Sequence, residues 1–128
     1  MKLLVDTSLL MLSVELGKNL IEIAEKELDE KLELYTLEDV IRELEGIAKG
    51  RGKKSRMARV ALAVASNFKI IRYLGEISVD EKIVKAAEEL KIPLATVDLE
   101  IIRKARKKNI PILIFHKDLR ITFEGWRE

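Results

Sequence analysis

The 128-residue chain contains no cysteine and no glutamine, and His116 is its single histidine. The lack of cysteine excludes disulfides, thiolate zinc sites and cysteine nucleophiles, and one histidine excludes a histidine-rich metal site. No apolar run is long enough to span a bilayer, and Asp6, Thr7 and Ser8 end the first apolar run too early for a signal peptide. We therefore expect a cytoplasmic protein with no membrane partner. Abundant lysine and glutamate without glutamine or cysteine is also typical of thermophile proteins.

The overall charge is nearly balanced, with 24 Lys and Arg against 22 Asp and Glu, a net charge of +2. Hydrophobic residues make up 48% of the chain, which indicates a globular protein rather than a disordered one. The length suits one domain with a real core, so we expect a single domain over residues 1–128. A net charge this small does not predict nucleic-acid binding, so the distribution of charge matters more.

Short apolar segments alternate with segments of helical periodicity along the chain. Strands are predicted at residues 2–6, 31–36, 68–74, 92–98 and 110–115, with a candidate short terminal strand at 120–126. Helices are predicted within 9–28 (broken at Gly17), from 36 to near 50, and at 57–67, 78–91 and 99–109. The alternation predicts an α/β fold, a three-layer α/β/α sandwich around a mostly parallel sheet of about five strands.

Two helix starts carry capping signals. Thr36 is predicted to cap the helix that ends near Gly50, and Ser78 with Glu81 is predicted to form a capping box. The residues of the latter helix predicted to face the core are Ile83, Ala86, Ala87 and Leu90.

Four acids occupy special positions in this pattern: Asp6 and Asp98 end the first and fourth strands, Asp80 opens the helix before the fourth strand, and Glu43 lies one turn into the helix after the second. Parallel strands present their carboxyl ends along one edge, where α/β sheets bind ligands, so one edge can gather all four. Each acid also has a purely structural explanation. Asp6 and Asp98 could each cap the helix that follows. Asp80 could interact favourably with the dipole at the start of its helix, and Glu43 could form an i,i+4 ion pair.

Clustered carboxylates repel one another and need a cation. Without thiols and with one histidine, the matching ion is a hard divalent one such as Mg2+ or Mn2+. Two such ions can activate a water molecule and stabilise the leaving oxygen of a phosphodiester.

One segment is strongly basic. It holds six cations and no acid within residues 49–59: Lys49, Arg51, Lys53, Lys54, Arg56 and Arg59. Gly50 and Gly52 indicate a mobile connector, and a charge run of this kind is most often solvated surface. Beside an acidic metal site, such a loop would also attract a phosphate backbone in a salt-dependent way. It has no interleaved aromatic residues, so base stacking is not predicted.

Three further features have structural interpretations. Residues 99–109 are predicted to form a basic amphipathic helix. His116 is expected at the end of the fifth strand, at the surface or sheet edge and without a catalytic role. Trp126 is expected to pack the C-terminal tail against the domain.

Three stretches, "LLVDTSLL", "YTLEDVIRELEGIAKG" and "SVDEKIVKAAEELKIPLATVDLEIIRKARKKNIPILI", resemble a PIN domain. Within that superfamily they are similar to archaeal proteins of the Fcf1/Utp23 ribosome-processing group and of the VapC9 type. The resemblance covers nearly the whole chain and keeps the order of the motifs. It implies a central parallel sheet between helices and a Mg2+- or Mn2+-dependent endoribonuclease.

The resemblance also implies roles for particular residues. The family's acidic pattern falls on Asp6, Glu43, Asp80 and Asp98, of which Glu43 would bind metal directly or through water. Supporting positions would be Thr7 or Ser8 after the first acid, Glu81 beside the third, and Thr96 of the Thr-x-Asp element. Val97 departs from the pattern, since many relatives have a polar residue there. The six cations would guide RNA, and the implied partners are RNA, a second copy of the chain, and an antitoxin or ribosome-assembly protein.

Two other functions compete with the ribonuclease. A non-enzymatic RNA-binding or assembly factor would keep the fold and the basic segment without turnover. A phosphoacceptor domain of the flavodoxin-like kind would need an acceptor Asp at the end of the third strand and a Lys after the fifth. Residues 68–74 end without an acid, and Lys117 is the one supporting feature.

Overall fold

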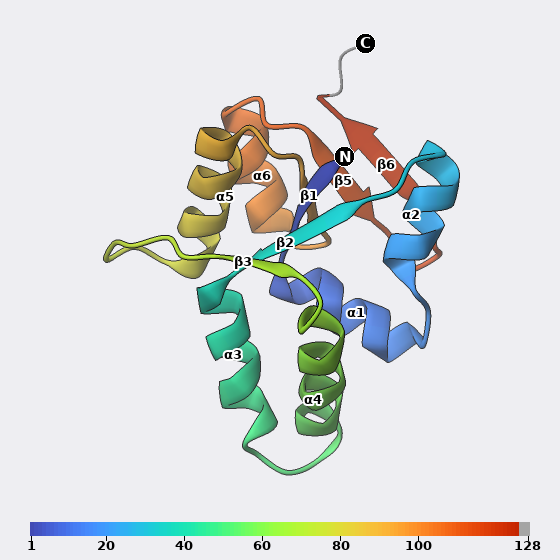
Figure 1. Cartoon of the computed structure of the whole chain (residues 1–128), viewed down its shortest axis with the longest axis vertical. Coiled ribbons are helices and arrows are strands. Elements are labelled where there is room, and N and C mark those ends of the chain that lie inside the picture. The colour runs from blue at the N-terminus through green and yellow to red at the C-terminus, as the bar shows by residue number, and fades with distance from the viewer. Residues whose placement is uncertain (126–128) are drawn as a thin grey trace.

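A six-stranded sheet forms the centre of the molecule in the computed structural model, which describes residues 1–125 (Figure 1). Its strands are β1 (Lys2–Val5), β2 (Glu33–Leu37), β3 (Lys69–Ile71), β4 (Leu94–Thr96), β5 (Ile112–Phe115) and β6 (Ile121–Glu124). They lie in the order β3-β2-β1-β4-β5-β6, parallel except for β6, which pairs antiparallel with β5. The predicted α/β fold is confirmed, and the candidate terminal strand is β6. Trp126 lies outside the described residues.

Six helices connect these strands: α1 (Thr7–Leu16), α2 (Leu20–Leu28), α3 (Glu38–Ala48), α4 (Lys53–Ala65), α5 (Val79–Leu90) and α6 (Leu99–Lys107). Parallel strands are joined by right-handed crossovers, which places α1, α3 and α4 on one face of the sheet and α5 and α6 on the other. Figure 1 shows α5 and α6 together, apart from α1, α3 and α4. Among residues 1–125, no helix is both long and apolar enough to cross a bilayer.

The order of the strands decides against the phosphoacceptor alternative. A flavodoxin-like sheet has the order 2-1-3-4-5, whereas here β2 separates β1 from β3. In addition, β3 ends at Ile71 and is followed by Arg72 rather than by an acid.

The core lies on both faces of the central strands. Leu3, Leu4 and Val5 of β1 are fully buried, and so are Leu94 and Ala95 of β4. All four residues of β5 are buried as well. Strands covered on both faces read as continuous apolar runs rather than as alternating ones, which is why these segments were recognisable in the sequence.

Two predicted details of the helix ends are wrong. Thr36 does not cap α3, because it stays in β2, where it pairs with Ile70 and donates its hydroxyl to the Val5 carbonyl at 2.7 Å. The N-cap of α3 is Leu37, which gives no side-chain cap. Leu90, predicted to face the core, lies in the last turn of α5 and is 51% exposed.

Only one of the two hydrogen bonds of the predicted Ser78–Glu81 capping box forms. Ser78 accepts a hydrogen bond from the Glu81 amide at 3.2 Å, as predicted for the N-terminus of α5. The reciprocal half of the capping box is replaced, because the Glu81 carboxylate contacts Lys104 of α6 at 3.8 Å.

The basic segment is helical over more of its length than predicted. The helix begins at Lys53, so Lys53, Lys54 and Arg56 project from a helix rather than from a loop. Gly52 is its N-cap, with a φ of 102° that residues other than glycine rarely adopt. The early start is explained by the buried Ser55, Ala58, Ala61 and Ala65, a stripe of small residues at helical spacing.

The turn between β5 and β6 holds His116 where it was expected, directly after β5. Its Nε2 lies 2.9 Å from the hydroxyl oxygen of Thr122 on β6. The ring is half-buried and does not line the pocket described next.

Candidate active site

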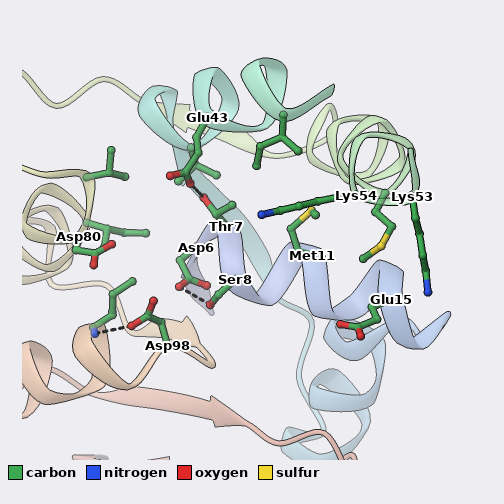
Figure 2. Close-up of a pocket in the computed structure, with 16 residues that line it drawn as sticks. Asp6, Thr7, Ser8, Met11, Glu15, Glu43, Lys53, Lys54, Asp80 and Asp98 are labelled. Carbon is green, nitrogen blue, oxygen red and sulfur yellow. Dashed lines mark hydrogen bonds between the residues drawn. The ribbon is translucent and has the colours of Figure 1, made fainter. Parts of the chain in front are cut away.

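A pocket of about 670 Å3 opens at the carboxyl ends of β1 and β4 (Figure 2). These strands are neighbours, but the chain runs from β1 outward to β2 and β3 and returns to β4 on the other side. Such a switch point is the usual ligand site of an open α/β sheet. Its lining includes all four predicted acids, each from a different segment: Asp6 before α1, Glu43 on α3, Asp80 on α5 and Asp98 before α6.

Asp6 is the most constrained of the four, with only 3% of its surface exposed. As the N-cap of α1, its Oδ1 accepts a hydrogen bond from the Leu9 amide at 3.0 Å. Its Oδ2 accepts from the Ser8 and Thr96 hydroxyls at 2.7 and 2.5 Å. Burial raises the pKa of Asp6 to about 6, with a smaller push from Asp98, against the lowering effect of these three hydrogen bonds.

Thr96 connects the two acids at the strand ends. Its hydroxyl oxygen donates to Asp6 and accepts from the Asp98 amide at 3.0 Å. Asp98 in turn caps α6 by accepting from the Glu100 and Ile101 amides at 2.8 and 3.3 Å. Both strand-end acids are therefore helix caps and pocket residues at the same time. Val97 takes part through its backbone, since its amide donates to the Ser8 hydroxyl at 3.3 Å.

Glu43 is held from the first turn of α1. The Thr7 hydroxyl donates to the Glu43 Oε1 at 2.5 Å, a contact between residues 36 positions apart. The structural alternative for Glu43 is wrong, because no ion pair of Glu43 is found within residues 1–125. The i,i+4 pair on α3 is Glu38–Arg42, at 2.8 Å.

Asp80 lies half-buried in the first turn of α5, and Figure 2 shows it on the side of the pocket away from Lys53 and Glu15. Burial raises its pKa, and the carboxylates of Asp98 and Glu43 raise it further, while Lys104 lowers it. Glu81, the predicted neighbour in this role, does not line the pocket, and its partner is Lys104.

An ion pair that the sequence did not predict joins the helices of Glu43 and Asp80. Lys82 of α5 contacts Asp39 of α3 at 2.9 Å, and the two side chains are only 13% and 19% exposed. The partners are 43 positions apart, so no local pattern indicates the pair. It fixes α3 against α5 close to the acids.

The basic segment borders the pocket through Lys53 and Lys54. Figure 2 shows Lys54 reaching from α4 toward Thr7, while Lys53 lies on the side of Glu15. Lys49, Arg51 and Arg56 are exposed outside the pocket. None of the six cations forms an ion pair with the described residues, but the Arg59 guanidinium donates to the Ala48 carbonyl at 2.7 Å and ties α4 to α3.

The lining also includes residues that the sequence reasoning missed. Met11 of α1 and Met57 of α4 form apolar wall beside the acids, and Glu15 of α1 adds a fifth carboxylate. Helical periodicity marked none of them as pocket residues, because it cannot separate a core position from a pocket wall.

The donor chemistry of the pocket suits a hard divalent cation, since its candidate ligands are carboxylate oxygens and the charge of Asp98 contributes to raising the pKa of both Asp6 and Asp80. The four acids nevertheless do not form a ready-made ligand cluster. In residues 1–125, no group of three or more Asp, Glu or His side chains is arranged to hold a metal ion.

Comparison with known proteins places the chain among PIN-type sequences. The family model described as PIN like domain matches residues 3–118. Ribonuclease VapC4 of Methanocaldococcus jannaschii is 31% identical over 117 residues, which are 88% of this chain and 88% of that protein. Ribonuclease VapC9 of Archaeoglobus fulgidus is 35% identical over 86 residues, which are 66% of this chain and 62% of that protein.

Solved structures agree on the fold. The PIN domain endonuclease Utp24 matches with a TM-score of 0.80 at 23% identity, over 99% of this chain and 93% of that one. A domain of a functionally unknown protein from Methanocaldococcus jannaschii matches with a TM-score of 0.61 at 24% identity, over 90% and 91% of the two chains. The sheet and its helices are therefore those seen in PIN domain structures.

Proposed function

The chain belongs to the PIN-like domain family, and from this premise we propose that it is a metal-dependent endoribonuclease that hydrolyses RNA phosphodiester bonds. One observation carries the proposal: four carboxylates from four separate segments line a single pocket at the switch point of the sheet. A purely structural role explains each acid alone but gives no reason for all four to border the same pocket.

The proposed cofactor is Mg2+ or Mn2+, with Asp6, Asp80 and Asp98 as direct ligands and Glu43 as a ligand directly or through water. When bound, such an ion activates a water molecule for attack and neutralises the charge on the leaving oxygen. The chain's own groups set the geometry: Ser8 and Thr96 fix the Asp6 carboxylate, and Thr7 orients Glu43.

The RNA backbone is proposed to approach along α4. Lys53 and Lys54 line the pocket, and Lys49, Arg51 and Arg56 extend the positive surface without acidic partners in the described chain. Uncompensated cations of this kind bind phosphates and release the counterions that were condensed on the RNA, so the binding weakens as the salt concentration rises. Arg59 has a structural bond to α3 as well, so we expect it to contribute less.

The biological role is proposed to be that of a VapC-like toxin or of an RNA-processing enzyme, on the basis of the ribonuclease names of the two relatives. A toxin would be accompanied by an antitoxin encoded next to it, and a processing enzyme by a ribosome-assembly partner. The chain is proposed to act in the cytoplasm, and a homodimer is compatible with either role.

The test is RNA cleavage by the purified protein with Mn2+ and with EDTA. We expect cleavage with Mn2+, none with EDTA, and a loss of at least about 100-fold in Asp6→Asn. Asp29→Asn is the matched control, because Asp29 is an exposed acid at the end of α2, outside the pocket. Metal-dependent cleavage that persists undiminished in Asp6→Asn would refute the assignment.

The second candidate, a non-enzymatic RNA-binding or assembly factor, is favoured by the lack of a ready-made ligand cluster among the described residues. It predicts salt-sensitive RNA binding with no turnover in Mg2+ or Mn2+. Measuring binding and cleavage on the same RNA therefore separates the two functions.

A further inference from the structure

A second basic surface lies beside the acid pocket, between α5 and α6. This α5–α6 groove has a volume of about 370 Å3 and is lined by Glu81, Val84, Lys85, Lys104, Lys107 and Lys108. Three of its lysines belong to the basic amphipathic segment predicted at residues 99–109, which has no part in the function proposed above.

The positive charge of the α5–α6 groove is only half compensated by the described residues. Lys85 and Lys107 have no ion pair with any residue in the range 1–125. Lys104 and Lys108 contact Glu81 and Glu88 at 3.8 and 3.4 Å, with 38–46% of each side chain exposed. Such exposed pairs are weak and exchange readily for another anion. Among the described residues, the four ammonium groups of the groove thus have two carboxylate partners, Glu81 in the lining and Glu88 outside it.

The α5–α6 groove and the acid pocket share no lining residue, but both are lined from α5 and α6. Glu81, in the lining of the groove, directly follows Asp80, and Lys104 lies on the helix that Asp98 caps. On the other side of the acids, the pocket is bordered by Lys53 and Lys54 of α4. Figure 1 shows α4 on one side of β1 and β2 and the α5–α6 pair on the other, so the acids lie between two basic surfaces.

We propose that the RNA substrate crosses the carboxyl edge of the sheet, held on one side by α4 and on the other by the α5–α6 groove. This inference rests on the proposed function and adds a second phosphate-binding surface to it. Lysines bind phosphates as point charges without demanding a fixed geometry, which suits a flexible single strand. Two flanking basic surfaces also offset the repulsion between the carboxylates and the scissile phosphate.

The composition of the α5–α6 groove favours RNA over an acidic protein as its occupant. Among residues 1–125, Val84 is the single apolar residue of its lining, and no aromatic or Met side chain from this range lines it. Protein interfaces are centred on buried aromatic, Met and Arg anchors and are depleted of lysine. The described part of the chain places no such anchor in this lysine-lined groove.

The test measures the binding of a fluorescein-labelled single-stranded RNA of about 20 nucleotides. Binding is measured in EDTA over a series of salt concentrations, so that no cleavage occurs. The variants are Lys85→Gln/Lys107→Gln, Lys53→Gln/Lys54→Gln, and the combination of all four. Lys18→Gln/Lys31→Gln is the matched control, because both of these exposed lysines lie outside the two basic surfaces. Thermal unfolding verifies that each variant is folded, and cleavage of the same RNA with Mn2+ is measured in parallel.

We expect Lys85→Gln/Lys107→Gln to reduce the slope of log affinity against log salt by about 1.4, equivalent to about 25-fold weaker binding at 0.1 M salt. The losses in log affinity should add in the quadruple variant, and the control should bind like wild type. Wild-type binding and salt slope in Lys85→Gln/Lys107→Gln, while Lys53→Gln/Lys54→Gln is weakened, would overturn this inference alone and point to an acidic protein instead. A wild-type protein that neither binds nor cuts the RNA would overturn the proposed function as well.

Discussion

Asp6 is both a structural cap and a proposed metal ligand, and these two roles make opposite demands. Capping α1 buries the carboxylate and surrounds it with hydroxyl and amide donors. Metal binding requires the same group to be ionised. Burial prevails over the hydrogen bonds and raises the pKa to about 6, so the metal-free protein at neutral pH holds a carboxylate that its surroundings disfavour.

The first prediction concerns the stability of the metal-free protein. The native pKa of Asp6, about 6, exceeds the unperturbed value of 3.8, so the native state binds this proton more tightly than the unfolded chain. The resulting stabilisation is complete below pH 3.8 and is lost as the pH rises through about 6. Asp6→Asn cannot ionise, so its free energy of unfolding relative to wild type should rise by about 3 kcal/mol from pH 3.5 to pH 7.5.

Urea unfolding in EDTA at several pH values measures this difference. Asp29→Asn should show no comparable trend, because Asp29 is an exposed acid. A difference between Asp6→Asn and wild type that stays constant with pH would contradict the prediction.

Thr7 provides the second prediction, since its hydroxyl is the bond that holds Glu43. Thr7→Val keeps the shape but removes the donor, so Glu43 is left free to rotate. Groups that orient a metal ligand typically contribute 10- to 100-fold, and we expect a loss of about 10-fold in kcat/KM. Thr7→Ser should restore most of the activity. Equal activity in wild type and Thr7→Val would show that Glu43 needs no such support.

At the scale of elements, the local signals in the sequence identified every strand and helix found in residues 1–125 but misplaced some ends. Gly17 ends α1 in a left-handed conformation, as its position suggested. The errors at Thr36 and Lys53 share a cause, because tertiary packing extended an element beyond its local signal. Pairing with β3 kept Thr36 in the strand, and burial of the small-residue stripe drew Lys53 into α4.

The Lys82–Asp39 pair provides the third prediction, because it joins α5 to α3. Lys82→Met leaves the Asp39 carboxylate half-buried without its partner, and we expect a loss of about 1–3 kcal/mol in the free energy of unfolding. The coupling energy from a double-mutant cycle with Asp39→Asn should exceed about 1 kcal/mol.

The exposed pair Glu38–Arg42 on α3 serves as the control and should show a coupling below about 0.5 kcal/mol. Lys82→Met should also weaken Mn2+ binding, because the helices of Glu43 and Asp80 lose their link. Unchanged stability and Mn2+ affinity would mean that packing alone sets the position of α5 against α3.

For the whole molecule, the convergence of the acids could be predicted but their support could not. Alternation of strands and helices implies a parallel sheet. Because the carboxyl ends of parallel strands lie along one edge, the sequence predicts that Asp6 and Asp98 are near one another. The Thr7–Glu43 and Lys82–Asp39 contacts join residues that are 36 and 43 positions apart in the sequence. Helical periodicity and capping motifs indicate only local contacts, so they predict neither of these two.

The fourth prediction is that Mn2+ stabilises the folded chain. A ligand that binds only the native state raises stability by about 2.7 kcal/mol at 100 times its dissociation constant, so the melting temperature should rise with Mn2+ concentration and return with EDTA. Asp98→Asn should abolish the rise, whereas Glu45→Gln, on the same helix as Glu43 but outside the pocket, should retain it. The same rise in wild type and Asp98→Asn would argue against metal binding at these acids.

The buried cap at Asp6 has an evolutionary consequence. Asparagine is as good a helix cap as aspartate, and at neutral pH it avoids a desolvated charge, so stability alone favours the substitution Asp6→Asn, which the proposed function expects to abolish activity. A lineage released from selection on activity would be expected to lose this carboxylate early and keep the fold. Retention of Asp6 together with Glu43, Asp80 and Asp98 is therefore what selection for a working pocket predicts, whereas selection for folding alone does not.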